Sequence, residues 1–111
     1  MFLIQLNEPL LTRFELERAV VASINAGLSE VVGEKCRDAI VKLFLKNSGL
    51  KRLEDVVDCP ERFEKFMGNV FGKGSVLLMD RITQNLMQRT SSTGSGCFSE
   101  QVTRLKELCL V

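Results

Sequence analysis

Apolar residues recur at three- and four-residue intervals along most of the chain, and this spacing is the feature that most restricts its fold. The first such stripe consists of Leu16, Val20, Val21, Ile24 and Leu28. No segment shows the alternation of apolar and polar residues that is typical of a half-buried strand. Because an amphipathic helix buries its stripe against another element, the sequence predicts an all-α protein, a compact bundle of four to five helices.

Capping signals and glycines predict where the first two helices begin and end. Thr12 and Glu15 have the spacing of a capping box, so the first helix should begin at Thr12 and end near Gly27. The second helix is expected after Ser29, and Gly49 should end it in a left-handed conformation. We expect this helix to bury an unbroken stripe of Val32, Cys36, Ala39, Ile40, Leu43 and Phe44.

A proline near a capping residue predicts the start of the third helix. Asp58 is expected to cap it, and Pro60 fits the first turn, where a missing amide costs nothing. One short turn is expected before it, from Leu53 to Val57, and Gly72 should end it. Its stripe is Phe63, Phe66, Met67, Val70 and Phe71. A fourth helix from about Ser75 to Arg89 carries Val76, Leu78, Met79, Ile82 and Leu86.

Composition divides the chain into three parts. Residues 1–89 should form a helical core domain with an extended N-terminal arm, which we define as residues 1–11. Residues 90–98 are polar and rich in glycine and serine, which is typical of a flexible linker. Residues 99–111 should form a tethered amphipathic helix. A helix this short is marginal in water, so it must dock on its own core or on another subunit.

The two ends of the chain carry more apolar side chains than a solvated segment should. Phe2, Leu3 and Ile4 lie in the arm, and the last helix has a narrow apolar seam. From these surplus surfaces we predict a homodimer. Its contact surface is expected to consist of Phe2, Leu3, Ile4, Val102, Leu105 and Leu108.

Composition excludes several classes of function. The 111 residues are 45% hydrophobic and 26% charged, which fits a single globular domain and not a disordered chain. No apolar run approaches the 20 or so residues of a membrane span, and no signal peptide is recognisable. The four cysteines form no Cys-x-x-Cys pair, and there is no histidine to complete a zinc site. We therefore expect a cytoplasmic protein with reduced cysteines, no metal and no cofactor.

The side chains most used in catalysis are scarce. Without histidine, no Ser-His-Asp or Cys-His arrangement can form within the chain. The segment from Gly68 to Ser75 departs from the phosphate-loop spacing and fits a helix end followed by a helix start, although an anion could lie near Lys73. We predict that the protein is not an enzyme. An enzyme would need a concave site that brings together acids such as Glu61, Glu64 and Asp80.

A basic cluster near the end of the second helix supports an alternative function. Its members are Lys42, Lys46, Lys51 and Arg52, which could contact nucleic-acid phosphates. Basic residues at a helix C-terminus are also ordinary partners of the helix dipole, and the net charge of the chain is only +1. Nucleic-acid binding is therefore the second prediction, after protein–protein interaction.

The middle of the chain also has a recognisable order of segments. These are Leu28–Ala39, Ile40–Leu45, Gly49-Leu50, Val56-Val57, Pro60-Glu61-Arg62-Phe63 and Val70–Ser75. This order resembles small archaeal all-helical domains of uncharacterised function, which occur alone or as output domains of sensor kinases. The likeness covers roughly residues 28–88. It implies an interaction or signalling module, and it transfers no catalytic residue.

Overall fold

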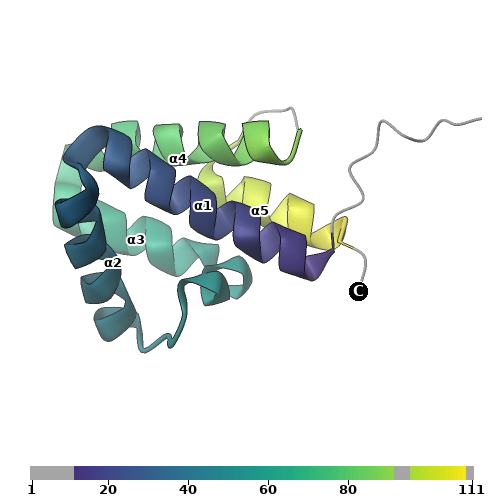
Figure 1. Cartoon of the computed structure of the whole chain (residues 1–111), viewed down its shortest axis with the longest axis horizontal. Coiled ribbons are helices and arrows are strands. Elements are labelled where there is room, and N and C mark those ends of the chain that lie inside the picture. Colours follow the sequence, from purple (N-terminus) through teal and green to yellow (C-terminus); the bar gives the residue numbers. More distant parts are fainter. Residues whose placement is uncertain (1–11, 92–95, 110–111) are drawn as a thin grey trace, which may run out of the picture.

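The computed structural model describes residues 12–91 and 96–109. These residues form five α-helices and two 3-10 turns, and no strand occurs among them (Figure 1). The prediction of an all-α bundle is confirmed. The elements in chain order are α1 (Arg13–Val32), α2 (Glu34–Ser48), η2 (Leu53–Asp58), α3 (Pro60–Phe71), η3 (Gly72–Gly74), α4 (Ser75–Arg89) and α5 (Phe98–Glu107).

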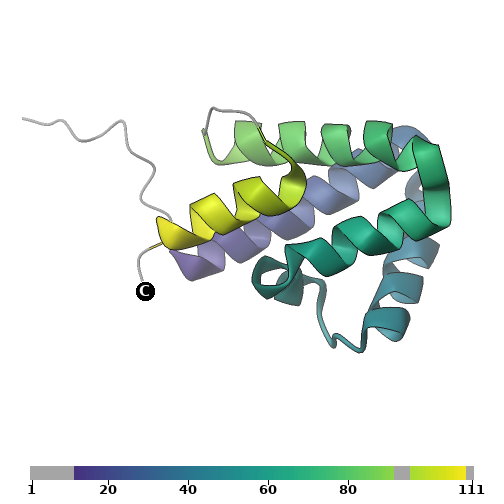
Figure 2. The same cartoon turned by 180° about the vertical axis from the view of Figure 1, so that it is seen from behind.

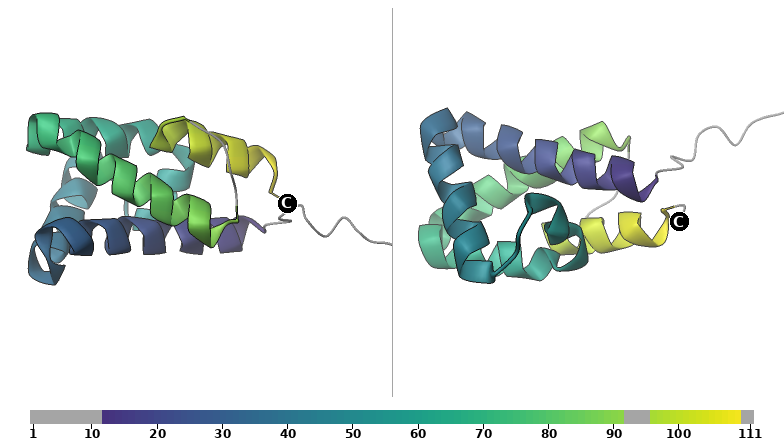
Figure 3. Two further views of the ribbon diagram at one scale, coloured as in Figure 1. Left: turned by 90° about the horizontal axis from the view of Figure 1, so that it is seen from above. Right: turned by 60° about the horizontal axis from the view of Figure 1, so that its bottom comes forward.

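Four helices run along the long direction of the molecule, and α2 crosses one end (Figures 1 and 2). α1 lies beside α4, while α3 and α5 cover the other side of the core, as the two views of Figure 3 show. Helix α5 packs against α3, α4 and α1. The last helix therefore docks on the core of its own chain.

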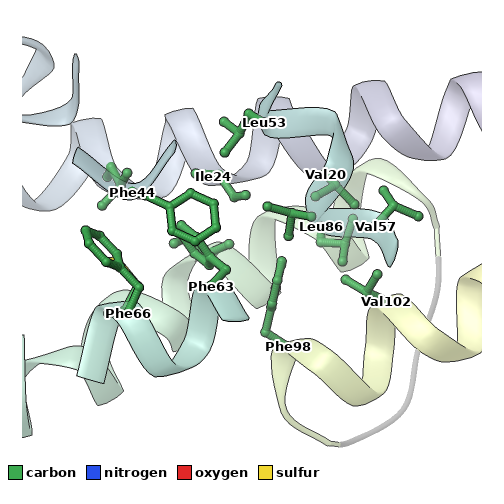
Figure 4. Close-up of a cluster of buried hydrophobic side chains, with 14 of the residues drawn as sticks. Val20, Ile24, Phe44, Leu53, Val57, Phe63, Phe66, Leu86, Phe98 and Val102 are labelled. Atoms are coloured by element: carbon green, nitrogen blue, oxygen red, sulfur yellow. The ribbon is translucent and has the colours of Figure 1, made fainter. Parts of the chain in front are cut away.

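All five helices and η2 contribute side chains to one apolar core. The aromatic part joins α2, α3 and α5: the Phe44 ring lies 5.2 Å from those of Phe63 and Phe66, and Phe63 lies 5.7 Å from Phe98 (Figure 4). Edge-on and tilted ring pairs at such distances are favourable beyond the area they bury. The buried core residues are Leu16, Val20, Ile24, Leu28, Phe44, Leu53, Val56, Val57, Phe63, Phe66, Met67, Leu78, Ile82, Leu86, Phe98, Val102 and Leu105.

The first helix is longer than predicted, and the expected start of the second helix after Ser29 is wrong. Helix α1 continues to Val32, and the chain turns at Gly33, whose φ of 87° favours glycine. Gly27 is not at a helix end but inside α1, where it meets α4. A Cβ atom there would lie 2.5 Å from Ile82 Cγ1, so the missing side chain allows the two helices to approach closely.

The predicted buried stripe of the second helix is also wrong in large part. In α2 only Phe44 is fully buried, whereas Cys36, Ala39 and Leu43 are exposed. The reason is that α2 crosses the end of the bundle (Figure 1), so beside Phe44 only the partly buried Ile40, Val41 and Leu45 of this helix pack against the core. Its end is as predicted, because Gly49 is left-handed with φ of 77°.

Asp58 does not cap the third helix. Cys59 occupies the N-cap position, but its thiol donates to the Asp55 carbonyl at 3.4 Å and does not cap the helix, and Pro60 is in the first turn as expected. The Asp58 carboxylate instead accepts a hydrogen bond from Arg13 Nη2 at 2.8 Å and pairs with Lys106 Nζ at 2.9 Å. These two bonds lower the pKa of Asp58, that of Lys106 having the larger effect. Asp58 thereby connects the end of η2 to the start of α1 through Arg13 and to α5 through Lys106.

The last helix begins earlier than predicted. Phe98 belongs to α5 and is buried, although the sequence placed it in the linker. Cys97 caps the helix: its sulfur accepts from the Glu100 amide, and its own amide donates to Glu100 Oε1 at 2.9 Å. The hydrogen bond from the Cys97 amide lowers the pKa of Glu100. Of the predicted linker, residues 92–95 lie outside the described residues.

Candidate binding groove

A groove of about 520 Å³ lies between the C-terminal half of α2 and the outer face of α3. The buried Phe44 and Phe66 rings form its floor, and Val70 stands on its rim with 44% of its surface exposed. Its remaining lining residues are Asn47, Ser48, Arg62, Lys65 and Asn69. An apolar floor with a few polar groups around it is typical of binding sites.

The charged side chains that line the groove are both cations. Arg62 and Lys65 lie in its wall, and its described lining residues include no carboxylate. Arg62 donates a hydrogen bond to the Ser48 carbonyl at 3.5 Å, a long contact. Within the described part of the chain neither cation forms an ion pair with an acid. The groove therefore presents positive charge that is not neutralised internally.

The groove results from the way the two helices end and start. Gly49 ends α2 at Ser48, and Pro60 begins α3 after η2, and the end of α2 then lines the groove together with α3. Arg62, Lys65 and Asn69 recur at three- and four-residue spacing, which places them on one face of α3. The side chains of Asn47 and Asn69 are exposed and make no hydrogen bond with another described residue.

Sequence reasoning assigned no role to Arg62, Lys65 or Asn69. The signal that could have indicated them is a polar row along α3 directly beside Phe66. This row lines a groove only because α2 crosses the end of the bundle and brings Phe44 and Asn47 opposite to it. That crossing cannot be predicted from the local sequence.

The predicted basic cluster lies outside the groove. Lys42 and Lys46 are two residues before and after Phe44, so they occupy the opposite, solvent-exposed face of α2. Lys51 and Arg52 are exposed in the following connection, and Arg52 pairs with Asp55 at 3.7 Å. Element η2 follows these residues as a six-residue 3-10 helix, and its first turn carries the acids Glu54 and Asp55 beside the cluster.

Two of the three predicted interface residues of the last helix are buried in the core. Val102 and Leu105 are buried against the rest of the chain, because the seam of α5 covers α3, α4 and α1. They therefore offer no exposed surface in this fold, whereas Leu108 is 49% exposed. Phe2, Leu3 and Ile4 lie outside the described residues.

Of the acids considered for catalysis, Glu61 lines a hollow between α3 and α5, whereas Glu64 and Asp80 do not. Glu61 is exposed, Glu64 accepts a hydrogen bond from the Ser99 amide at 3.0 Å, and Asp80 accepts one from Gln84 at 3.0 Å. Among residues 12–91 and 96–109, no cluster of three His, Cys, Asp or Glu side chains could hold a metal ion. The Gly68–Ser75 segment is the end of α3, the turn η3 and the start of α4, as predicted.

The four cysteines are free thiols. Cys36 and Cys97 are exposed, and partial burial raises the pKa of Cys59 and of Cys109. The sequence placed Cys36 on a buried face, and the structure places it on an exposed one. The described helices include none with both the length and the apolar character needed to cross a membrane.

Comparison with family models, curated proteins and solved structures gave no match. The likeness to archaeal helical domains therefore stays a prediction from the sequence.

Proposed function

We propose that this chain is a non-enzymatic, cytoplasmic protein–protein interaction module whose contact surface is the groove between α2 and α3. The observation that carries the proposal is the combination in one groove of an aromatic floor, an exposed apolar rim residue and two cations that pair with no acid among the described residues. Apolar and aromatic-lined grooves of this kind recur in proteins that bind a segment of another protein.

The chemistry of the groove also suggests what the partner segment carries. An apolar side chain would cover Val70 and the edges of the phenylalanine floor, and removing this surface from water favours binding. A carboxylate nearby would pair with Lys65 or Arg62. The amides of Asn47 and Asn69 can bond to the backbone of an extended segment.

Peptide display tests this proposal without a known partner. A library of random peptides is selected on the full chain, and each selected peptide is then measured against two variants. Val70→Asp places a charge on the rim of the groove, and Val76→Asp is the matched control on α4, where Val76 is 73% exposed. We expect apolar-acidic peptides that lose at least about tenfold in affinity, about 1.4 kcal/mol, with Val70→Asp only.

Two results would refute the proposal. Selected peptides that bind Val70→Asp as well as the original chain would place the contact surface elsewhere. A selection that enriches no peptide over an unrelated helical protein would remove the interaction role of the groove. Circular dichroism of both variants checks that each retains its helices.

A nucleic-acid role is the second candidate, because Lys42, Lys46 and Lys51 are exposed and form no ion pair within the described residues. Its test is binding of a mixed-sequence DNA duplex at low salt. If the protein binds nucleic acid, its affinity for the duplex should fall steeply with rising salt, and it should be lower still in the double variant Lys42→Glu/Lys46→Glu. Absence of binding at high micromolar protein would reject it.

A further inference from the structure

We propose that the occupant of the α2–α3 groove is the N-terminal arm, residues 1–11, of a second copy of this chain. The inference rests on the proposed function, since it names the partner of the same groove. It makes the protein a homodimer in which each copy inserts its arm into the other.

The composition of the arm fits the groove. Its first six residues, Met1 to Leu6, contain five apolar side chains and one glutamine, and Glu8 is the only charged side chain before Arg13. The groove offers an apolar floor with Val70 at the rim, and two cations that no acid in residues 12–91 and 96–109 neutralises by an ion pair. An apolar segment with one carboxylate is the chemistry that such a groove selects.

The position where the arm joins the described structure favours a second copy. Thr12 lies beside the last turn of α5, where Cys109 Sγ approaches the Thr12 carbonyl at 3.9 Å. α2 crosses the molecule at its opposite end (Figure 1). α1 alone extends about 30 Å, and eleven residues span at most about 40 Å. An arm folded back on its own chain would use much of its length to reach the groove.

An arm from a second copy can enter the groove with its full apolar run. Two copies related by a twofold axis would make the contact twice, each arm in the partner's groove, which closes the assembly at a dimer. The second contact is then intramolecular within the complex, so two modest contacts give a stable pair.

Sedimentation equilibrium of the full chain tests the inference. We expect a monomer–dimer equilibrium within about 1 to 500 µM, the range in which weak dimers dissociate. Leu3→Asp removes the apolar run of the arm, and Val70→Asp places a charge on the rim of the groove. Each should weaken dimerisation at least about tenfold, and Lys65→Glu should also weaken it without touching a buried residue. Val76→Asp should leave the dimer unchanged.

Mixing the two defective variants gives a sharper test. Leu3→Asp keeps an intact groove and Val70→Asp keeps an intact arm, so an equimolar mixture can form one arm–groove contact that neither variant forms alone. We expect partial recovery of dimer in the mixture. A synthetic peptide of residues 1–11, amidated at its C-terminus, should dissociate the original dimer.

Several outcomes would overturn the inference. A chain that stays monomeric up to about 500 µM does not form the proposed dimer. A dimer that persists in both Leu3→Asp and Val70→Asp is not held together by the arm and the groove. A mixture without recovery contradicts exchange of arms. If display peptides still lose affinity with Val70→Asp while the chain stays monomeric, only the choice of occupant is wrong. If Val70→Asp affects neither measurement, the proposed function fails too.

Discussion

Replacing Gly27 with alanine tests whether the close approach of α1 and α4 determines the stability of the fold. A Cβ atom at this position would lie 2.5 Å from Ile82 Cγ1 and 3.1 Å from both the Cα and the backbone nitrogen of Ile82. The Ile82 side chain could rotate, but the backbone can move only if the two helices separate. The substitution therefore forces either strain or a wider interface.

Two opposing effects determine the size of the change. Alanine in a helix interior is more favourable than glycine by about 1 kcal/mol. Overfilling a packed core costs about 1–3 kcal/mol. Because the backbone of α4 is part of the clash, we expect the second effect to prevail, with a net loss of roughly 1–2 kcal/mol in the free energy of unfolding. That corresponds to a drop in Tm of at least about 4 °C.

Thermal and urea unfolding followed by circular dichroism measure this change, and the chain supplies a matched control. Gly68 lies inside α3, and a Cβ atom there would meet nothing within 4 Å. Gly68→Ala should therefore raise stability by about 0.5–1 kcal/mol. A Gly27→Ala variant as stable as the original chain, or as much stabilised as Gly68→Ala, would refute the reasoning.

Two further changes address polar groups that join or interrupt the core. Asp58→Asn should lose about 0.5–1 kcal/mol at pH 7, a modest value because the Asp58 side chain is 54% exposed. Since the folded-state pKa is lowered, this contribution is present above the unfolded value of about 3.9 and disappears as pH falls through the folded-state pKa. Urea titrations at several pH values should show the two chains converging in acid, and a difference that grows in acid would contradict this sign. Gln101→Met should stabilise the chain by at most about 1 kcal/mol. The buried Gln101 Nε2 has no hydrogen-bond partner among the described residues, although the substitution also removes the bond that Gln101 Oε1 accepts from Arg104 at 3.3 Å. A clear fall in Tm would show that the amide is satisfied.

The helix ends that the sequence predicted well are those with local causes. The capping box of Thr12 and Glu15, the left-handed Gly49 and the proline start at Pro60 depend on residues only a few positions apart. The prediction that Gly27 ends a helix was wrong because its local sequence is the same whether the glycine ends a helix or makes room for a distant one. Local spacing cannot distinguish these two causes.

The groove depends on tertiary geometry that no local pattern contains. The stripe of α2 predicts a buried face, but its burial depends on where α2 crosses the bundle, and only Phe44 reaches the core fully. The same crossing brings Asn47 opposite Lys65 and Asn69 across the groove. The seam of α5 likewise has two possible partners in the sequence, its own core or another subunit, and the structure places it on its own core.

Chemical-shift mapping tests most directly whether the α2–α3 groove is the contact surface. The full chain is labelled with ¹⁵N and titrated with the tightest peptide from the display selection. The proposal predicts that the largest amide shifts fall in Phe44–Ser48 and Arg62–Val70, with little change at the start of α4. Shifts centred on Val76 and Leu77, or spread evenly over the helices, would contradict it.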